Sequence, residues 1–166
     1  VIQIGTVFHK YGEEEPYDRS IVVMGPKDDM EDSEICDDLN GINVYRCKNE
    51  RELLLKWKDL IINKDPDILS GYNIYGFDYP YLWDRAEELG IINRYSLLGK
   101  FKSKHSTIQE KKLSSSAFGD NSWREITTIG RIQIDLLKVI QRSYNLTSYK
   151  LDNVSSHFMS GKITLC

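Results

Sequence analysis

The segment of residues 65–82 restricts the fold more than any other part of this chain. It contains a short apolar stretch at 68–72, a loop with two glycines, and then the start of a helix. A buried strand that passes through a glycine-containing loop into a helix is typical of α/β folds. Asp78 ends the loop, so we expect its side chain at the carboxyl end of the strand, where open α/β sheets bind their ligands.

Asp78 allows two interpretations from its position alone. An aspartate at a helix start most often accepts a hydrogen bond from the first backbone N–H groups and caps the helix. Alternatively, a carboxylate that leans outward supplies the hard oxygen that Mg²⁺ prefers, while the ion keeps several waters. We expect the preceding residue, Phe77, to face the core and to fix the backbone that orients Asp78.

The N-terminal part of the chain predicts a small sheet followed by a helix. Runs of apolar and β-branched residues indicate strands at 1–8, 20–24 and 42–47, of which the first two form an antiparallel hairpin. Asn49 with Glu52 three residues later is typical of a helix N-cap. A proline downstream ends this helix, because neither proline nor its predecessor favours helical geometry.

The C-terminal part predicts alternating strands and helices. We expect a helix at 79–89, an irregular segment at 93–127, a strand at 126–134 and a last helix at 152–158. Asp135 follows the strand, and we expect it to cap the next helix in preference to a catalytic role. The order of elements favours an α/β fold, in which helices flank a mixed sheet.

The composition excludes few classes of function. The 166 residues are 40% hydrophobic with a net charge of −3, which is ordinary for one globular domain. This charge argues against a protein that holds duplex DNA through phosphates alone, but not against an enzyme that binds a few nucleotides in a cleft. The three cysteines form no CxxC pair, which disfavours a zinc or redox motif and favours a reducing intracellular compartment. No apolar run is long enough to span a bilayer, so no membrane partner is expected.

Several separated stretches of the sequence, first among them GYNIYGFDYPYL at residues 71–82, resemble family B DNA polymerases of the delta type, found in eukaryotes and large DNA viruses. Residues 71–82, GYNIYGFDYPYL, resemble the second exonuclease motif of this family, which reads YN, a short spacer, FD and then a tyrosine–leucine pair. The strand at 1–4 is similar to the one that follows the first motif of the family. Further similar stretches are DPDI at 65–68, GRIQIDLL at 130–137, IQRSYNL at 140–146 and SYKLDNVS at 148–155.

The resemblance implies a 3′→5′ proofreading exonuclease domain with a ribonuclease-H-like fold. In this family four carboxylates hold two divalent metals, Mg²⁺ or alternatively Mn²⁺, which activate water and stabilise the leaving oxygen. By motif matching, Asp78 is one of these carboxylates and therefore both a catalytic and a metal-binding residue. Asn73 and Phe77 are expected to shape the pocket around the terminal nucleotides of the DNA.

The chain departs from the family pattern at both ends. The first motif, an Asp-x-Glu strand, is expected before Val1, and the third, Tyr-x-x-x-Asp, after the end of the chain. We therefore expect residues 1–166 to be a single partial exonuclease domain of a larger polymerase, incomplete at both ends and inactive alone. Asp29-x-Glu31 spells the first motif but lies in an acidic loop, and Tyr149-x-x-Asp152 is one residue short of the third.

Basic residues concentrate in the irregular segment, among them Lys100 and Lys102. A solvated loop is the simplest interpretation, and contact with single-stranded DNA or a neighbouring polymerase domain is the alternative, for which we select these two lysines.

The expected partners are a frayed single-stranded 3′ primer end, the remaining polymerase domains and a sliding clamp, in the nucleus or a viral replication compartment. Two other functions stay open: a degenerate, non-catalytic scaffold, and a stand-alone four-carboxylate exonuclease.

Overall fold

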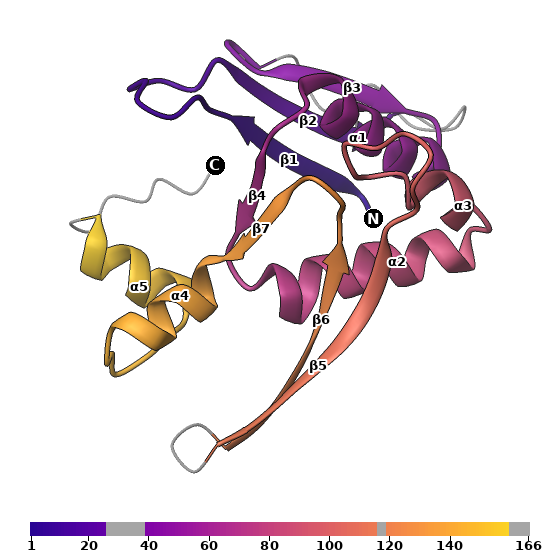
Figure 1. Ribbon diagram of the computed structural model, residues 1–166. Helices are drawn as coiled ribbons and strands as arrows, with labels where there is room; N and C mark the ends of the chain where they lie inside the picture. Colours follow the sequence, from indigo (N-terminus) through magenta and orange to yellow (C-terminus); the bar gives the residue numbers. More distant parts are fainter. Residues whose placement is uncertain (26–38, 116–118, 160–166) are drawn as a thin grey trace.

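A computed structural model describes residues 1–25, 39–115 and 119–159. The predicted acidic loop with Asp29 and Glu31 lies outside these residues. The described chain combines small sheets with helices packed against them (Figure 1). The predicted α/β class is confirmed, although the strands form three small sheets where one mixed sheet was expected.

The first sheet contains β1 (Gln3–Phe8), β2 (Asp18–Met24) and β3 (Asn43–Cys47). β1 and β2 pair antiparallel, which confirms the predicted hairpin, and β2 pairs with β3 in parallel. Within the described residues β1 pairs only with β2, so its second edge is open.

Helix α1 (Glu50–Lys64) begins and ends where the sequence predicts. Asn49 Oδ1 accepts a hydrogen bond from the Glu52 N–H at 3.0 Å, while Glu52 Oε2 accepts from the Lys48 N–H at 3.1 Å. This is a capping box in which the glutamate bonds one residue further out than usual. The helix ends at Asp65, which adopts a left-handed φ of 47° before the proline.

The hydrophobic core lies between α1, the first sheet and the helices that follow. Trp57 lies on the buried face of α1, and its indole N–H donates to Thr6 Oγ1 at 3.1 Å. Its ring stacks on Tyr95, which is fully buried. The core side chains of α1 are Leu53, Leu54, Leu55, Trp57, Leu60 and Ile61.

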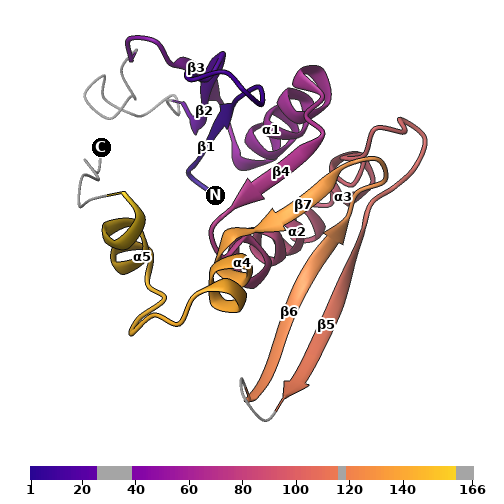
Figure 2. The same ribbon diagram turned by 60° about the vertical axis from the view of Figure 1, so that its left-hand side comes forward.

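The second sheet contains β4 (Ile68–Gly71) and β7 (Ile132–Asp135), which pair in parallel along their whole length (Figure 2). The expected burial of β4 is wrong, because Ile68 is 50% exposed. The physical reason is that β7 is the only strand paired with β4 among the described residues, so its other edge is open.

Three helical segments follow β4. A π-helical turn, η2 (Ile74–Asp78), leads directly into α2 (Tyr79–Glu88), and α3 (Ile92–Tyr95) comes next. The end of α2 agrees with the prediction, because Gly90 adopts a positive φ of 66° just beyond it.

The third sheet is a long hairpin of β5 (Thr107–Ser115) and β6 (Gly119–Thr127), which extends away from the rest of the described chain in both views (Figures 1 and 2). The expectation of an irregular segment is wrong for these residues. Their strands carry charged and polar side chains without apolar alternation, so the sequence lacks the signal of a half-buried strand. Arg124 of β6 anchors the hairpin to α2 by pairing with both carboxylate oxygens of Asp84, each at 2.8 Å.

Helices α4 (Leu136–Ser143) and α5 (Leu151–Phe158) end the described chain and agree with the predicted positions. Tyr149 OH, between them, donates to the carbonyl of Tyr144 at 2.8 Å and accepts from the Leu146 N–H at 3.3 Å. In the described ranges, none of the helices combines the length and hydrophobicity needed to cross a membrane.

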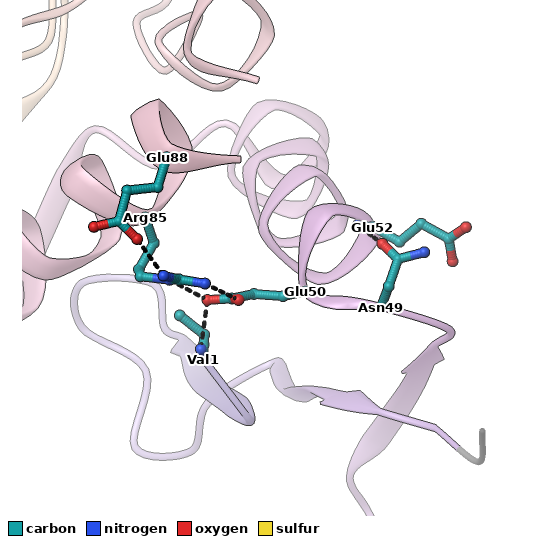
Figure 3. Close-up of polar contacts among 6 residues, drawn as sticks. All are labelled: Val1, Asn49, Glu50, Glu52, Arg85 and Glu88. Atoms are coloured by element: carbon teal, nitrogen blue, oxygen red, sulfur yellow. Dashed lines mark hydrogen bonds and ion pairs between the residues drawn. The ribbon is translucent and has the colours of Figure 1, made fainter. Parts of the chain in front are cut away.

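Glu50, at the start of α1, joins this helix to α2 (Figure 3). Arg85 donates from Nε to Oε1 of Glu50 at 2.8 Å and from Nη2 to Oε2 at 2.5 Å, which is a bidentate pair. The amino group of Val1 also donates to Oε1 at 2.6 Å. The hydrogen bonds from Arg85 are the largest cause that lowers the pKa of Glu50 from 4.5 to about 2.

This pairing predicts an acid-sensitive contribution to stability. The folded-state pKa of Glu50 lies below its ordinary value, so the carboxylate stabilises the fold above pH 4.5 and loses this effect as the pH falls to 2. Because Arg85 is partly exposed and screened by water, we expect a contribution of about 1–2 kcal/mol. Urea unfolding at about pH 6 and about pH 2 measures it: Glu50→Gln lowers stability at pH 6 and converges on the wild type at pH 2. Glu14→Gln, at an exposed glutamate, is the control, and an equal deficit of Glu50→Gln at both pH values would contradict the assignment.

Candidate functional site

The candidate site is the loop that connects β4 to α2, residues 71–78. It leaves the carboxyl end of β4, where Gly71 lies opposite Asp135 of β7 in the parallel register. Asn73 then adopts a left-handed φ of 59°, a conformation that asparagine tolerates better than most residues. The next residues form the π-helical turn η2, a rare geometry that is frequent at functional sites. The local sequence therefore builds an unusual backbone at the position where α/β sheets bind ligands.

Two glycines make this loop possible. A Cβ atom on Gly76 would lie 2.4 Å from Oδ1 of Asn73, and one on Gly71 would lie 2.5 Å from Cγ2 of Ile74. Both distances are shorter than carbon contacts allow, and Ile74 is fixed because it is buried in the core. The loop thus depends on Gly71 for close packing, while a side chain at Gly76 would displace that of Asn73.

Asp78 is the last residue of η2 and has helical dihedral angles. Its side chain makes no capping hydrogen bond to α2, so the capping interpretation is wrong. The residue is exposed. Partial desolvation of the carboxyl raises its pKa, as does the negative charge of Asp135 to a smaller extent, while a contact with its own backbone lowers it. The arrangement leaves this carboxylate accessible to a cation.

Phe77 does not face the core, contrary to the prediction. Its side chain is 63% exposed, and its ring stacks almost parallel on that of Tyr81, with the centroids 5.9 Å apart. The physical reason is the π-helical turn, which shifts the buried positions to Ile74 and Tyr79. The result is an exposed surface of two aromatic rings whose residues flank Asp78 in the sequence.

Asp135 caps α4, as predicted, and also holds the candidate loop. Its Oδ1 accepts from the Leu137 N–H at 3.0 Å and from the Asn73 N–H at 2.8 Å, and its Oδ2 accepts from the Tyr75 N–H at 3.1 Å. The residue is 2% exposed. Sequence reasoning missed the second role, and the only available signal was an aspartate at the end of a strand next to the loop.

The two lysines selected for DNA binding do not join Asp78. Lys100 pairs with Asp67 at 2.6 Å and with Asp65 at 3.5 Å, immediately before β4, whereas Asp78 follows the opposite end of this strand. Lys102 is exposed in the loop after α3, and no described contact links it to residues 71–78. Their role in DNA binding stays a prediction.

The alternative acidic motif at the C-terminal end is structural. The backbone carbonyl of Tyr149 accepts a hydrogen bond from Tyr72 OH at 2.5 Å, so Tyr149 ties the segment before α5 to the candidate loop. Asp152 is exposed in the first turn of α5. The structure therefore gives Tyr149 a structural role and leaves Asp152 on the surface.

Asp78 has the chemistry of a metal ligand, but one carboxylate is not a complete site. In the described part of the chain no group of three or more histidine, cysteine, aspartate or glutamate side chains is arranged to hold a metal ion. Asp135 is poorly placed to supply a second ligand, because it is 2% exposed and its carboxylate already accepts from three backbone N–H groups.

Comparison with known proteins defines the class. The family model described as DNA polymerase family B, exonuclease domain, matches residues 1–154. The chain therefore belongs to the family B DNA polymerases and to their exonuclease domain.

The similar proteins are DNA polymerases of a virus and of eukaryotes by name. A DNA polymerase of Pyramimonas orientalis virus is 42% identical over 163 residues, which is 98% of this chain and 13% of the relative. The DNA polymerase delta catalytic subunits of Glycine max and Dictyostelium discoideum are 38% and 40% identical, over 96% of this chain and 14% of each relative. The predicted resemblance is confirmed, and the chain spans 13–14% of the length of these relatives.

Proposed function

We propose that this chain is the 3′→5′ proofreading exonuclease domain of a DNA-directed DNA polymerase that acts in DNA replication. Its substrate is a mispaired primer end that frays from the template and loses its last nucleotide by phosphodiester hydrolysis. The observation that carries the proposal is the exposed Asp78, which does not cap its helix and stands in the second exonuclease motif of the family. Residues 1–166 form part of this domain in the larger protein.

Asp78 is the residue of this chain that holds the metals. Two Mg²⁺ ions, or Mn²⁺ in their place, supply the water activation and the stabilisation of the leaving oxygen when they are bound. The hard carboxylate oxygen of Asp78 suits both ions. Its remaining partners are the Asp-x-Glu and Tyr-x-x-x-Asp motifs of the whole protein.

Phe77 and Asn73 bind the DNA end. The ring of Phe77 is 63% exposed and stacked on Tyr81, so its free face is available to stack on an unpaired base. Asn73 belongs to the same loop, and its side-chain amide supplies hydrogen bonds to the terminal nucleotides. Lys102, which is exposed, and Lys100, whose ion pairs with Asp67 and Asp65 would have to open, are the basic residues that we assign to the single strand further along its path.

A ribonuclease-H-like sheet is part of this proposal. A groove of about 650 Å³ is lined by residues of both β1 and β4, including Thr6, Phe8 and Leu69. Among the described strands, β1 and β4 each have one unpaired edge. One strand inserted in this groove would hydrogen-bond to both edges and join the first two sheets into one mixed sheet. The Asp-x-Glu strand of the family is the occupant that we propose.

The other partners follow from the same function. They are the remaining domains of the polymerase, which deliver the primer end, and a sliding clamp. The working location is the nucleus or a viral replication compartment.

The test uses the full-length protein and a labelled primer annealed to a template, with a matched or a mismatched 3′ end. We expect the primer to be shortened in the presence of Mg²⁺, and faster from the mismatched end, because an unpaired end reaches the site without first breaking base pairs. EDTA should stop the shortening. Absence of shortening in both Mg²⁺ and Mn²⁺ would instead identify a degenerate scaffold.

A further inference from the structure

Asp135, at the end of β7, contacts both the candidate loop and the first turn of α4. It is 2% exposed, and its partners are the backbone N–H groups of Asn73, Tyr75 and Leu137. Only the Leu137 contact belongs to helix capping. The other two join β7 to a loop about 60 residues earlier in the sequence.

The two loop contacts lie at the point where the backbone departs from regular geometry. Asn73 has a positive φ, and Tyr75 is the second residue of η2, which ends at Asp78. A backbone N–H that is shielded from water needs an acceptor, and here a charged acceptor serves two such groups. The hydroxyl of Tyr75 also donates to the carbonyl of Gln133 at 2.9 Å, so the same turn is attached to β7 a second time.

We propose that Asp135 is a positioning residue for the nuclease site: it fixes the turn that presents Asp78 through the N–H groups of Asn73 and Tyr75, and does not itself bind metal or DNA. The inference rests on the proposed function, because it assigns the residue that orients a metal ligand. A single substitution can separate this positioning role of Asp135 from its role as the cap of α4.

Asp135→Asn preserves the cap and breaks one of the two contacts with the loop, that with the Tyr75 N–H. Asparagine is as good an N-cap as aspartate, and its single oxygen can still accept from Leu137 and Asn73. Its NH₂ group then faces the N–H of Tyr75, where two donors meet and no hydrogen bond forms. Asp135→Ser is a second variant, since serine also caps helices but is too short to reach the loop.

The experiment measures single-turnover hydrolysis of a mismatched primer end by the full-length protein as a function of Mg²⁺ concentration. Changes in groups that orient metal ligands typically cost about 10–100-fold in metal affinity or activity. We expect a loss of about this size for Asp135→Asn, with a higher Mg²⁺ requirement and unchanged polymerase activity. Hydrogen–deuterium exchange should show faster exchange in a peptide that covers residues 72–79.

Asn49→Ala is the matched control, because it removes the cap of α1, far from the loop in the sequence. We expect it to retain the wild-type hydrolysis rate, Mg²⁺ requirement and exchange at 72–79. Unchanged hydrolysis in both Asp135 variants, or unchanged exchange in the loop, would overturn the inference. Hydrolysis that survives Asp78→Ala would overturn the proposed function itself. If Asp78→Ala loses hydrolysis and Asp135→Asn keeps the wild-type rate, only the positioning role of Asp135 is contradicted.

Discussion

Replacing Asp78 with alanine is expected to abolish removal of a mismatched 3′ nucleotide by the full-length protein. Its carboxylate is exposed and does not cap α2, so the substitution removes a proposed metal ligand without opening a cavity in the core. A bound metal contributes several kcal/mol to the stabilisation of the transition state, and its loss corresponds to a decrease on the order of 10³-fold or more. The measurement is the rate of Mg²⁺-dependent release of the terminal nucleotide, with polymerase activity recorded on the same preparation.

Asp152→Ala is the control for this result. Asp152, like Asp78, is an exposed aspartate near the start of a helix, but it belongs to the Tyr149-x-x-Asp152 motif, to which we assign no catalytic role. We expect it to retain the wild-type rate. Retained proofreading in Asp78→Ala would show that Asp78 is not part of the site. Loss of proofreading in Asp152→Ala would show that the Tyr149-x-x-Asp152 motif takes part in catalysis.

The largest effect on stability is expected for Arg131→Met. The Arg131 side chain is 1% exposed and donates from Nε to the carbonyl of Leu98 at 2.9 Å and from Nη1 to the carbonyl of Pro66, with an ion pair to Asp65 at 2.9 Å. Methionine fills similar space but leaves two carbonyls without donors, each of which costs about 1–3 kcal/mol when buried. We expect the free energy of unfolding of the chain to fall by roughly 2–4 kcal/mol in urea denaturation.

The comparison for Arg131 is Arg124→Met, which breaks the bidentate pair with Asp84. That pair is about one third to one half exposed, and such pairs contribute about 0–1 kcal/mol. A destabilisation by Arg131→Met as small as that by Arg124→Met would contradict the structural role given to the buried guanidinium.

Local signals explain which parts of the fold could be predicted from the sequence. The cap at Asn49, the end of α1 at Asp65 and the glycine after α2 act within a few residues, and all three agree with the structure. The β5–β6 hairpin was missed, because both of its strands are rich in polar residues and its pairing is set by partners across the hairpin. Phe77 was assigned to the core, because a regular helical turn was assumed where the chain forms a π-helical one.

The candidate site was predicted only as far as its local motif reaches. Asp78 and its loop follow from the order of strand, glycines and helix, together with the family resemblance. The second role of Asp135 depends on the parallel pairing of β4 with β7, which brings it opposite Gly71. No spacing in the sequence encodes that register, so this contact could be found only in three dimensions.

The open edges of β1 and β4 have a consequence for the chain as a separate polypeptide. Each edge presents a row of backbone N–H and C=O groups that among the described residues have no strand partner, and such edges are templates for pairing with another molecule. The groove between them is therefore an aggregation hazard at high protein concentration, and a peptide that fits as a strand would act as a solubilising ligand. The Asp-x-Glu strand that we propose for this groove would protect the chain from self-association and would also supply carboxylates to the site.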